Sequence, residues 1–269
     1  MAVPSTTPPR HICVHASEQL SPHLQRIYFS SEDFSDFPTD QNGAHIKLFF
    51  SEQAEFKPLL PYRNEQGQVL WPDGKKPTIR TYSVRNFLAD EKLLVVDFVR
   101  HADYGAAADW AINAQPGQFI GLAGPGGRPR FNPNADYWVF IGDLSALPMI
   151  AASLELLPAH AEGEVWLEIE DERDCINLLH PADVTLHWLI QDQQAEEKIL
   201  ASLAQLDWNQ QKISVSLAGE NSRVVSLLKV FKKIYKVAKT HLYAVPYWKK
   251  GHTEETYHQE RHHVMDHET

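Results

Sequence analysis

The sequence of 269 residues is poor in cysteine, in net positive charge and in long apolar runs. Its two cysteines, Cys13 and Cys175, are too few and too isolated for a disulfide framework or a thiolate metal site, so we expect free thiols and no iron–sulfur cluster. The formal net charge of −10 argues against nucleic-acid binding. No apolar run is long enough for a membrane span, and residues 1–10 lack the apolar core of a signal peptide. We therefore expect a cytoplasmic protein without membrane insertion.

The N-terminal half consists of short β-rich runs separated by proline, glycine, asparagine and aspartate. This pattern is typical of a small closed antiparallel barrel. The predicted strands are residues 12–14, 24–29, 45–50, 78–84, 93–99 and 118–123. The polar, proline-rich segment 51–77 is expected to be a long surface loop.

After a linker at residues 130–134, strands alternate with helices, which predicts a mainly parallel α/β sheet with right-handed crossovers. The predicted strands are residues 137–141, 164–169, 186–190, 213–217 and 242–245, and the helices are 147–157, 195–206 and 222–237. We therefore expect a barrel domain at 1–133, an α/β domain at 134–246 and a C-terminal arm at 247–269.

Ligands of parallel sheets bind at the carboxyl ends of strands, where Asp143, Ser145, Gly219 and Glu220 are expected to lie. The chain nevertheless has no G-x-G-x-x-G, so the usual dinucleotide fingerprint is absent. Taken alone, both glycine-containing turns are explained by ordinary strand-to-helix geometry.

The segment Arg80-Thr81-Tyr82-Ser83 is the first candidate binding site. Side chains alternate along a strand, so Arg80 and Tyr82 share one face. That face offers a guanidinium to a pyrophosphate and a phenol ring to a flat ring system. Ser83 can act through its backbone N–H, or through its hydroxyl if the strand bends. A half-buried strand with a core Tyr82 and a solvated Arg80 explains this segment equally well.

A second candidate follows the predicted strand that ends near Val99. His101 lies in a loop that reaches Gly105, and Ala106 and Ala107 open a short helix-prone run. The first turn of such a helix presents free N–H donors and a positive dipole end, which suit a diphosphate. A routine loop and helix is the alternative.

The ordered set of motifs resembles the siderophore-interacting proteins, which are flavin-dependent ferric-siderophore reductases of the ferredoxin-NADP reductase superfamily. The resemblance is carried by residues 45–50, 80–85, 98–101, 105–107, 114–118, 124–127, 141–148, 217–220 and 247–251. It implies an FAD-binding barrel followed by an NAD(P)H-binding-like domain. It also implies that FAD is bound by Arg80, Thr81, Tyr82, Ser83, Val99, His101, Gly105, Ala106 and Ala107.

The resemblance further implies a substrate and a donor. The substrate is a ferric siderophore, whose iron is released as ferrous iron when an electron arrives from NADH, NADPH or a ferredoxin. Lys47, Arg130 and Lys249 match the basic triad of the family's siderophore pocket. The motif does not distinguish Lys249 from Lys250; we favour Lys249. Without the resemblance, all three lysines are explained as solvated or snorkelling side chains.

The remaining basic and histidine-rich segments leave alternatives open. His258 and His262 have the i, i+4 spacing of a helical metal site, but we interpret the tail as a polar helical arm without a metal. Lys232 and Lys233 are expected on a solvated helix face, and a ferredoxin docking patch is the minority interpretation. We expect a monomer. The rival functions are a flavin reductase with a protein or free-flavin acceptor, and a siderophore-binding protein without catalysis.

Overall fold

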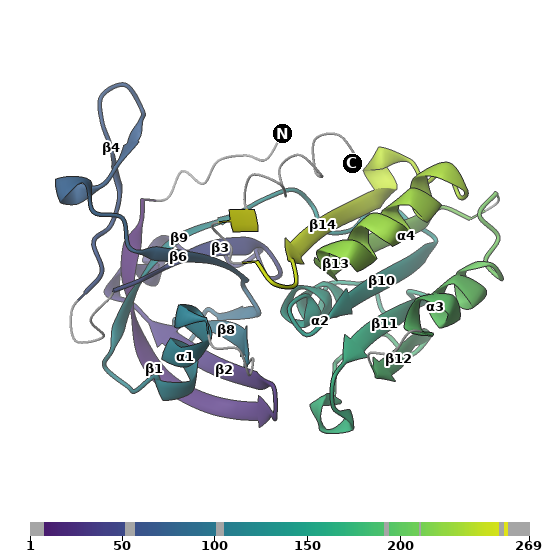
Figure 1. Cartoon of the computed structure of the whole chain (residues 1–269), viewed down its shortest axis with the longest axis horizontal. Helices are drawn as coiled ribbons and strands as arrows, with labels where there is room; N and C mark the ends of the chain where they lie inside the picture. The colour runs from purple at the N-terminus through teal and green to yellow at the C-terminus, as the bar shows by residue number, and fades with distance from the viewer. Residues whose placement is uncertain are drawn as a thin grey trace. The chain divides into compact units, whose positions relative to one another are not determined.

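The computed structural model describes residues 8–51, 57–100, 105–190, 194–209, 211–252 and 256–257. The chain forms two compact units, Met1–Arg128 and Pro129–Thr269, and each has its own sheet (Figure 1). Among the described residues, no helix is both long enough and apolar enough to cross a membrane.

The first unit is built on a seven-stranded antiparallel sheet with the order β6-β3-β9-β1-β2-β8-β7. Its strands are β1 (Arg10–Ser21), β2 (Leu24–Ser30), β3 (His45–Phe50), β6 (Thr78–Ser83), β7 (Asn86–Leu88), β8 (Leu93–Val99) and β9 (Phe119–Gly126). Six of them match the predicted strands, with ends that extend further in β1 and β9. The seventh, β7, was not predicted, because three residues are too few to establish an alternating pattern.

The sheet closes on itself because its two outermost strands follow each other in sequence. Only Val84 and Arg85 separate β6 from β7. The Val84 amide donates to the Ala44 carbonyl just before β3 (2.8 Å), and the Arg85 amide donates to the Val95 carbonyl in β8 (2.9 Å). The segment 78–88 therefore joins both ends of the sheet, and an apolar core fills the interior. The helix α1 (Ala106–Asn113) packs on this core through Trp110.

The expectation of a loop across residues 51–77 was wrong in part. The described residues of this segment include a small hairpin of β4 (Tyr62–Arg63) and β5 (Val69–Leu70), followed by the 3₁₀ turn η2 (Pro72–Gly74). The hairpin turn between β4 and β5 is held by the side-chain oxygen of Asn64, which accepts from the Gln68 amide at 2.8 Å. Gly67 supplies the positive φ of 75° that the turn requires. Polar composition alone did not distinguish this turn from an extended loop.

The second unit contains a five-stranded, fully parallel sheet with the order β12-β11-β10-β13-β14. Its strands are β10 (Tyr137–Asp143), β11 (Gly163–Ile169), β12 (Val184–Ile190), β13 (Ile213–Glu220) and β14 (Leu242–Trp248), and its helices are α2 (Leu147–Glu155), α3 (Ala195–Leu203) and α4 (Asn221–Lys233). The predicted alternation of strands and helices is confirmed. All three helices end earlier than predicted, and the left-handed φ of Lys236 (53°) keeps the chain beyond α4 from continuing as a helix.

Helices cover both faces of this parallel sheet. α3 and α4 lie side by side on one face (Figure 1), where they pack against Val139 and Ile141 of β10. Gly142 directly follows Ile141 in the alternation of β10 and therefore faces α2 on the opposite face of the sheet. A Cβ added to Gly142 would lie 2.9 Å from Cδ1 of Ile150, so glycine allows this close helix–strand contact. We therefore expect a ligand of this sheet to bind at the carboxyl ends of β10, β11 and β13.

Candidate functional site

The ladder between β3 and β6 places the side chains of the Arg80–Ser83 motif on two faces. Arg80 is opposite Leu48 and Tyr82 is opposite Ile46, whereas Thr81 is opposite Lys47. Facing residues in a ladder point to the same side. Arg80 and Tyr82 therefore share one face, as predicted, while the Lys47 ammonium donates to the Thr81 hydroxyl on the other face.

Three aromatic rings connect this motif to the other predicted binding segments of the first unit. The Tyr82 ring centroid lies 4.3 Å from that of Phe98 on β8. Phe98 in turn lies 6.1 Å from Trp110 on α1. Because Val99 follows Phe98 directly, these contacts bring β6, the end of β8 and α1 together.

The first turn of α1 offers backbone donors. Gly105 is its N-cap, and among the described residues no side-chain cap is seen there. The first helical hydrogen bond runs from the Asp109 amide to the Gly105 carbonyl (3.0 Å), so the amides of residues 106–108 lie before it. Gly105 and Ala106 are exposed, whereas Ala107 is buried against the barrel. A diphosphate could bind at these amides.

Arg100 is a candidate that sequence reasoning missed. It follows Val99 at the end of β8, and its backbone amide donates to the His23 carbonyl at 2.9 Å. Its Nη1 atom is buried and has no hydrogen-bond partner among the described residues. A buried guanidinium nitrogen in this condition is suited to an anionic ligand. The available signal was a basic residue directly after a buried strand. His101 lies outside the described residues.

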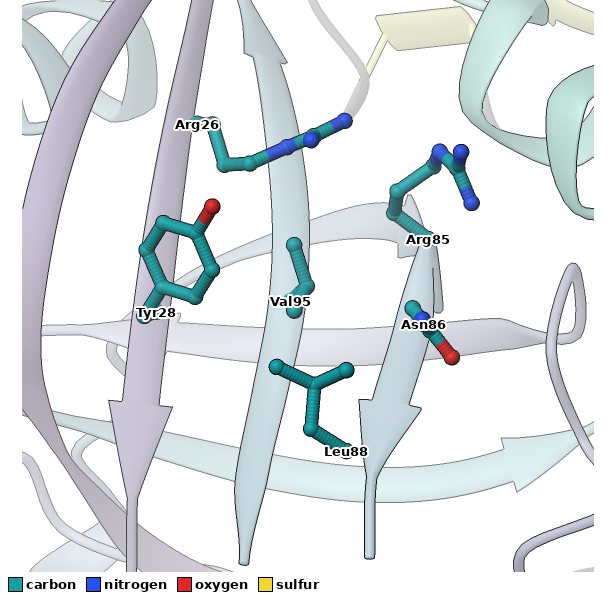
Figure 2. Close-up of a pocket in the computed structure, with 6 residues that line it drawn as sticks. All are labelled: Arg26, Tyr28, Arg85, Asn86, Leu88 and Val95. Carbon is teal, nitrogen blue, oxygen red and sulfur yellow. The ribbon is translucent and has the colours of Figure 1, made fainter. Parts of the chain in front are cut away.

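A separate small pocket lies on β2, β7 and β8 of the first unit. Figure 2 shows its lining residues, with the side chains of Arg26 and Arg85 at one end and Leu88 at the other. Arg26 already binds the buried Asp97 through two hydrogen bonds of 2.7 and 2.9 Å. The pocket measures about 110 Å³ and contains none of the predicted site residues. It is too small for a dinucleotide, since drug-sized ligands alone take roughly 300 Å³ or more.

The predicted chelate-binding residues are distributed over both units. Lys47 lies on β3 of the first unit, while Arg130 and Lys249 belong to the second. The Arg130 carbonyl accepts from the Ser216 hydroxyl (2.6 Å), which ties that segment to β13. Lys249 is half-buried directly after β14, and Lys250 is exposed.

The four residues predicted in the nucleotide lobe come together at the carboxyl ends of β10 and β13. The Asp143 carboxylate accepts from the Ser145 amide (2.8 Å) and from the Glu220 amide (2.8 Å). Gly219 lies beside it with a φ of 127°. Trp248, which the sequence did not mark for this site, donates its indole N–H to the same carboxylate at 2.8 Å.

Most of the predicted C-terminal arm, including His258 and His262, lies outside the described residues. Tyr257 is described and is buried, with 1% of its surface exposed. Its hydroxyl donates to the Asn221 side chain at 2.7 Å. A buried tyrosine thus ties this part of the arm to the start of α4 through a hydrogen bond.

An antiparallel barrel followed by a parallel α/β unit is the ferredoxin reductase-like fold. The ferredoxin reductase of carbazole 1,9a-dioxygenase superposes with a TM-score of 0.64 at 14% identity, over 91% of this chain and 68% of that one. This likeness establishes the fold class.

Sequence comparisons identify the family within that class. Residues 13–129 match the siderophore-interacting FAD-binding domain, and residues 135–251 match the siderophore-interacting protein model. The ferric vibriobactin reductase of Vibrio cholerae serotype O1 is 41% identical over 97% of this chain and 96% of its own length. The chain belongs to the siderophore-interacting protein family.

Two further relatives span both units. The siderophore-interacting protein SipS of Aeromonas hydrophila has a TM-score of 0.81 and 34% identity, over 96% of this chain and 98% of its own. The NADPH-dependent ferric-chelate reductase of Escherichia coli K12 is 31% identical over 82% of this chain and 86% of its own length.

Proposed function

We propose that this protein is a ferric-siderophore reductase that uses FAD to pass electrons to siderophore-bound iron, which is released as ferrous iron. The observation that carries the proposal is the 41% identity to ferric vibriobactin reductase across 97% of this chain. A match of that extent includes both the barrel and the parallel-sheet unit.

The residues of the first unit fit the cofactor. The buried Arg100 nitrogen and the first backbone amides of α1 offer donors for a diphosphate. Arg80 adds a second guanidinium, and the half-buried ring of Tyr82 provides a surface for a flat ring system. Together with Thr81, Ser83, Val99, His101 and the segment Gly105–Ala107, these residues would hold FAD. When bound, FAD supplies a ring that accepts a hydride and releases electrons singly.

The substrate is expected to be anionic. Ferric iron is a hard cation that siderophores hold through oxygen ligands, and a ferric tris-catecholate carries a high negative charge. With a formal charge of −10, the protein would repel such a chelate. Lys47, Arg130 and Lys249 counter this repulsion in our proposal, with an effect that salt weakens. Their part is to bind and orient the chelate, because electron transfer requires proximity.

NADPH is the donor best supported by the relatives, since the Escherichia coli reductase is NADPH-dependent. A ferredoxin is the alternative donor. Both carry electrons in the cytoplasm, where we place the reaction. We also propose that the protein acts as a monomer.

Anaerobic absorbance spectroscopy tests the function directly. The purified protein should show a bound-flavin spectrum that bleaches with NADPH, NADH or a reduced ferredoxin. Adding a ferric catecholate with a ferrous trap should then restore the spectrum and yield the ferrous complex. Samples without chelate, and samples without protein, are the controls.

Two outcomes contradict the proposal. A flavin that stays reduced in the presence of the chelate would indicate a reductase with a different acceptor. A colourless protein that binds the chelate but takes up no FAD would indicate a siderophore-binding protein without catalysis.

A further inference from the structure

The parallel sheet has one position where its topology favours a phosphate ligand. From β10 the chain adds β11 and β12 on one side and then returns to add β13 and β14 on the other side. The topological switch point, where the strand order reverses, therefore lies between β10 and β13. Ligands of such sheets bind at the carboxyl ends of these strands, and their phosphates accept from amides in the loops that follow. Here these amides are those of Ser145, after β10, and Glu220, at the end of β13.

Both amides are already bound by the Asp143 carboxylate. Oδ1 accepts from the Ser145 amide at 2.8 Å and from its hydroxyl, while Oδ2 accepts from the Glu220 amide and the Trp248 indole, each at 2.8 Å. A carboxylate has about four lone-pair sites, and all four have a donor from this chain. Asp143 therefore has no acceptor site left for a ribose hydroxyl, and it occupies the donors that a phosphate would use.

The carboxylate also fills the space at the switch point. Only 8% of Asp143 is exposed. A Cβ added to Gly219 would lie 2.6 Å from Oδ2, and the φ of Gly219 is 127°. The backbone of β13 thus packs directly against the carboxylate, in a conformation that glycine alone adopts readily.

Neighbouring acidic groups also disfavour the binding of a phosphate at this position. Glu168 on β11 is in register with Asp143 and is also 8% exposed. Arg223, in the first turn of α4, is a nearby cation, but Glu168 binds it at 2.6 and 3.0 Å and Glu196 binds its other nitrogen. Glu220 accepts from the first amides of α4. Two carboxylates therefore bind the Arg223 guanidinium, and Asp143 and Glu220 add further negative charge, so that a pyrophosphate here would meet like charge.

We infer that Asp143 is a specificity-determining residue that keeps the pyrophosphate of NAD(P)H from binding at the switch point. The inference rests on the proposed function. It makes the dinucleotide a weakly bound donor in this lobe, so that a one-electron protein donor such as a ferredoxin competes with it.

Calorimetric titration of the FAD-loaded protein with NADP⁺ tests this inference without relying on turnover. Asp143→Ala releases both amides and removes the charge, so NADP⁺ should bind about tenfold more tightly than to the wild type. Glu162→Gln removes the same charge at the amino end of the sheet and serves as the matched control, with an unchanged dissociation constant. Unchanged or weaker NADP⁺ binding by Asp143→Ala, with its fold intact by circular dichroism, overturns the inference.

A second variant keeps the inference testable if Asp143→Ala does not fold. Glu168→Gln leaves Asp143 in place but removes one of the two carboxylates that bind Arg223. Because the guanidinium is then less neutralised, NADP⁺ should bind about threefold more tightly, which is the usual contribution of one ion pair. No tightening in this variant counts against the inference. Chemical reduction of the wild type with dithionite, followed by the ferric catecholate, needs no dinucleotide. Failure of that reaction contradicts the proposed function, whereas success without tighter NADP⁺ binding by the variants contradicts only the role of Asp143.

Discussion

At the scale of single residues, the ring of Tyr82 connects the barrel core to the proposed flavin site. It packs against Phe98, and through Phe98 it is linked to Trp110 of α1. Arg80 shares its strand face. One aromatic residue thus supports the packing of the barrel and offers a surface to a planar ligand.

Replacing Tyr82 should therefore weaken FAD binding. We expect Tyr82→Ala to raise the FAD dissociation constant about tenfold, because an aromatic contact contributes roughly 0.5–1.5 kcal/mol beyond its buried area. Tyr82→Phe should retain most of the affinity. Fluorescence titration of the apoprotein with FAD measures both.

The matched control for this prediction is Tyr28→Ala, which removes a tyrosine from the pocket of Figure 2. Its FAD affinity should equal that of the wild type. An equal loss of affinity in the Tyr28 and Tyr82 variants would indicate general destabilisation of the barrel and contradict a specific role for Tyr82.

At the scale of secondary-structure elements, α4 depends on Glu220 at its N-terminus. The carboxylate accepts from the Ser222 amide at 2.6 Å, and its other oxygen accepts from the Lys250 amide at 3.3 Å. Burial by itself raises the pKa of Glu220, but the hydrogen bonds from Ser222, Lys250 and Arg223 outweigh it and hold the pKa below the ordinary glutamate range. The residue thus joins the end of β13, α4 and the segment after β14.

Glu220→Ala should lower the free energy of unfolding by about 1 kcal/mol at pH 7, the usual effect of losing a helix cap. A lowered folded-state pKa stabilises the protein above the unfolded pKa, and this contribution disappears as the pH falls through the folded pKa. The difference in the free energy of unfolding between variant and wild type should therefore become smaller as the pH falls. Urea denaturation at pH 7 and near pH 4 measures this difference.

Glu197→Ala is the control, because Glu197 is exposed in the first turn of α3 and the described structure shows no hydrogen bond to its side chain. This substitution should lower the free energy of unfolding by less than Glu220→Ala does at both pH values. A difference for Glu220→Ala that grows as the pH falls would contradict the assigned role of its carboxylate.

At the scale of the whole molecule, the three basic residues proposed to bind the chelate are tested together. Changing Lys47, Arg130 and Lys249 together to Ala should lower ferric catecholate reduction by about tenfold or more, since a focused positive field raises anion association by that order. The FAD content should stay unchanged. The wild-type rate should fall as salt is added, and the variant should lose much of this salt dependence.

A second triple variant controls for net charge. Lys75, Lys229 and Lys239 are exposed lysines, with one in the first unit and two in the second, as in the proposed triad. Their replacement by Ala should change the rate little. Equal losses in the two triple variants would mean that overall charge, and not a local site, governs the reaction.

The sequence by itself determined those features that depend on local periodicity. Alternation along residues 80–83 placed Arg80 and Tyr82 on one face, and the change from β-rich runs to strand–helix alternation separated a barrel from a parallel sheet. The order of motifs along the chain was sufficient to indicate the family. These features need only near neighbours in sequence, so the local pattern carries them.

The tertiary structure alone decided which distant residues meet. Closure of the barrel depends on backbone hydrogen bonds from Val84 to the residue before β3 and from Arg85 to β8, and no local pattern specifies such partners. Likewise, Asp143 marked the end of a strand in the sequence, but its contacts with Glu220 and Trp248 arise from the order of three parallel strands. Only packing brings residues 143, 220 and 248 together, and that contact turns an expected nucleotide site into one whose amides are already bound.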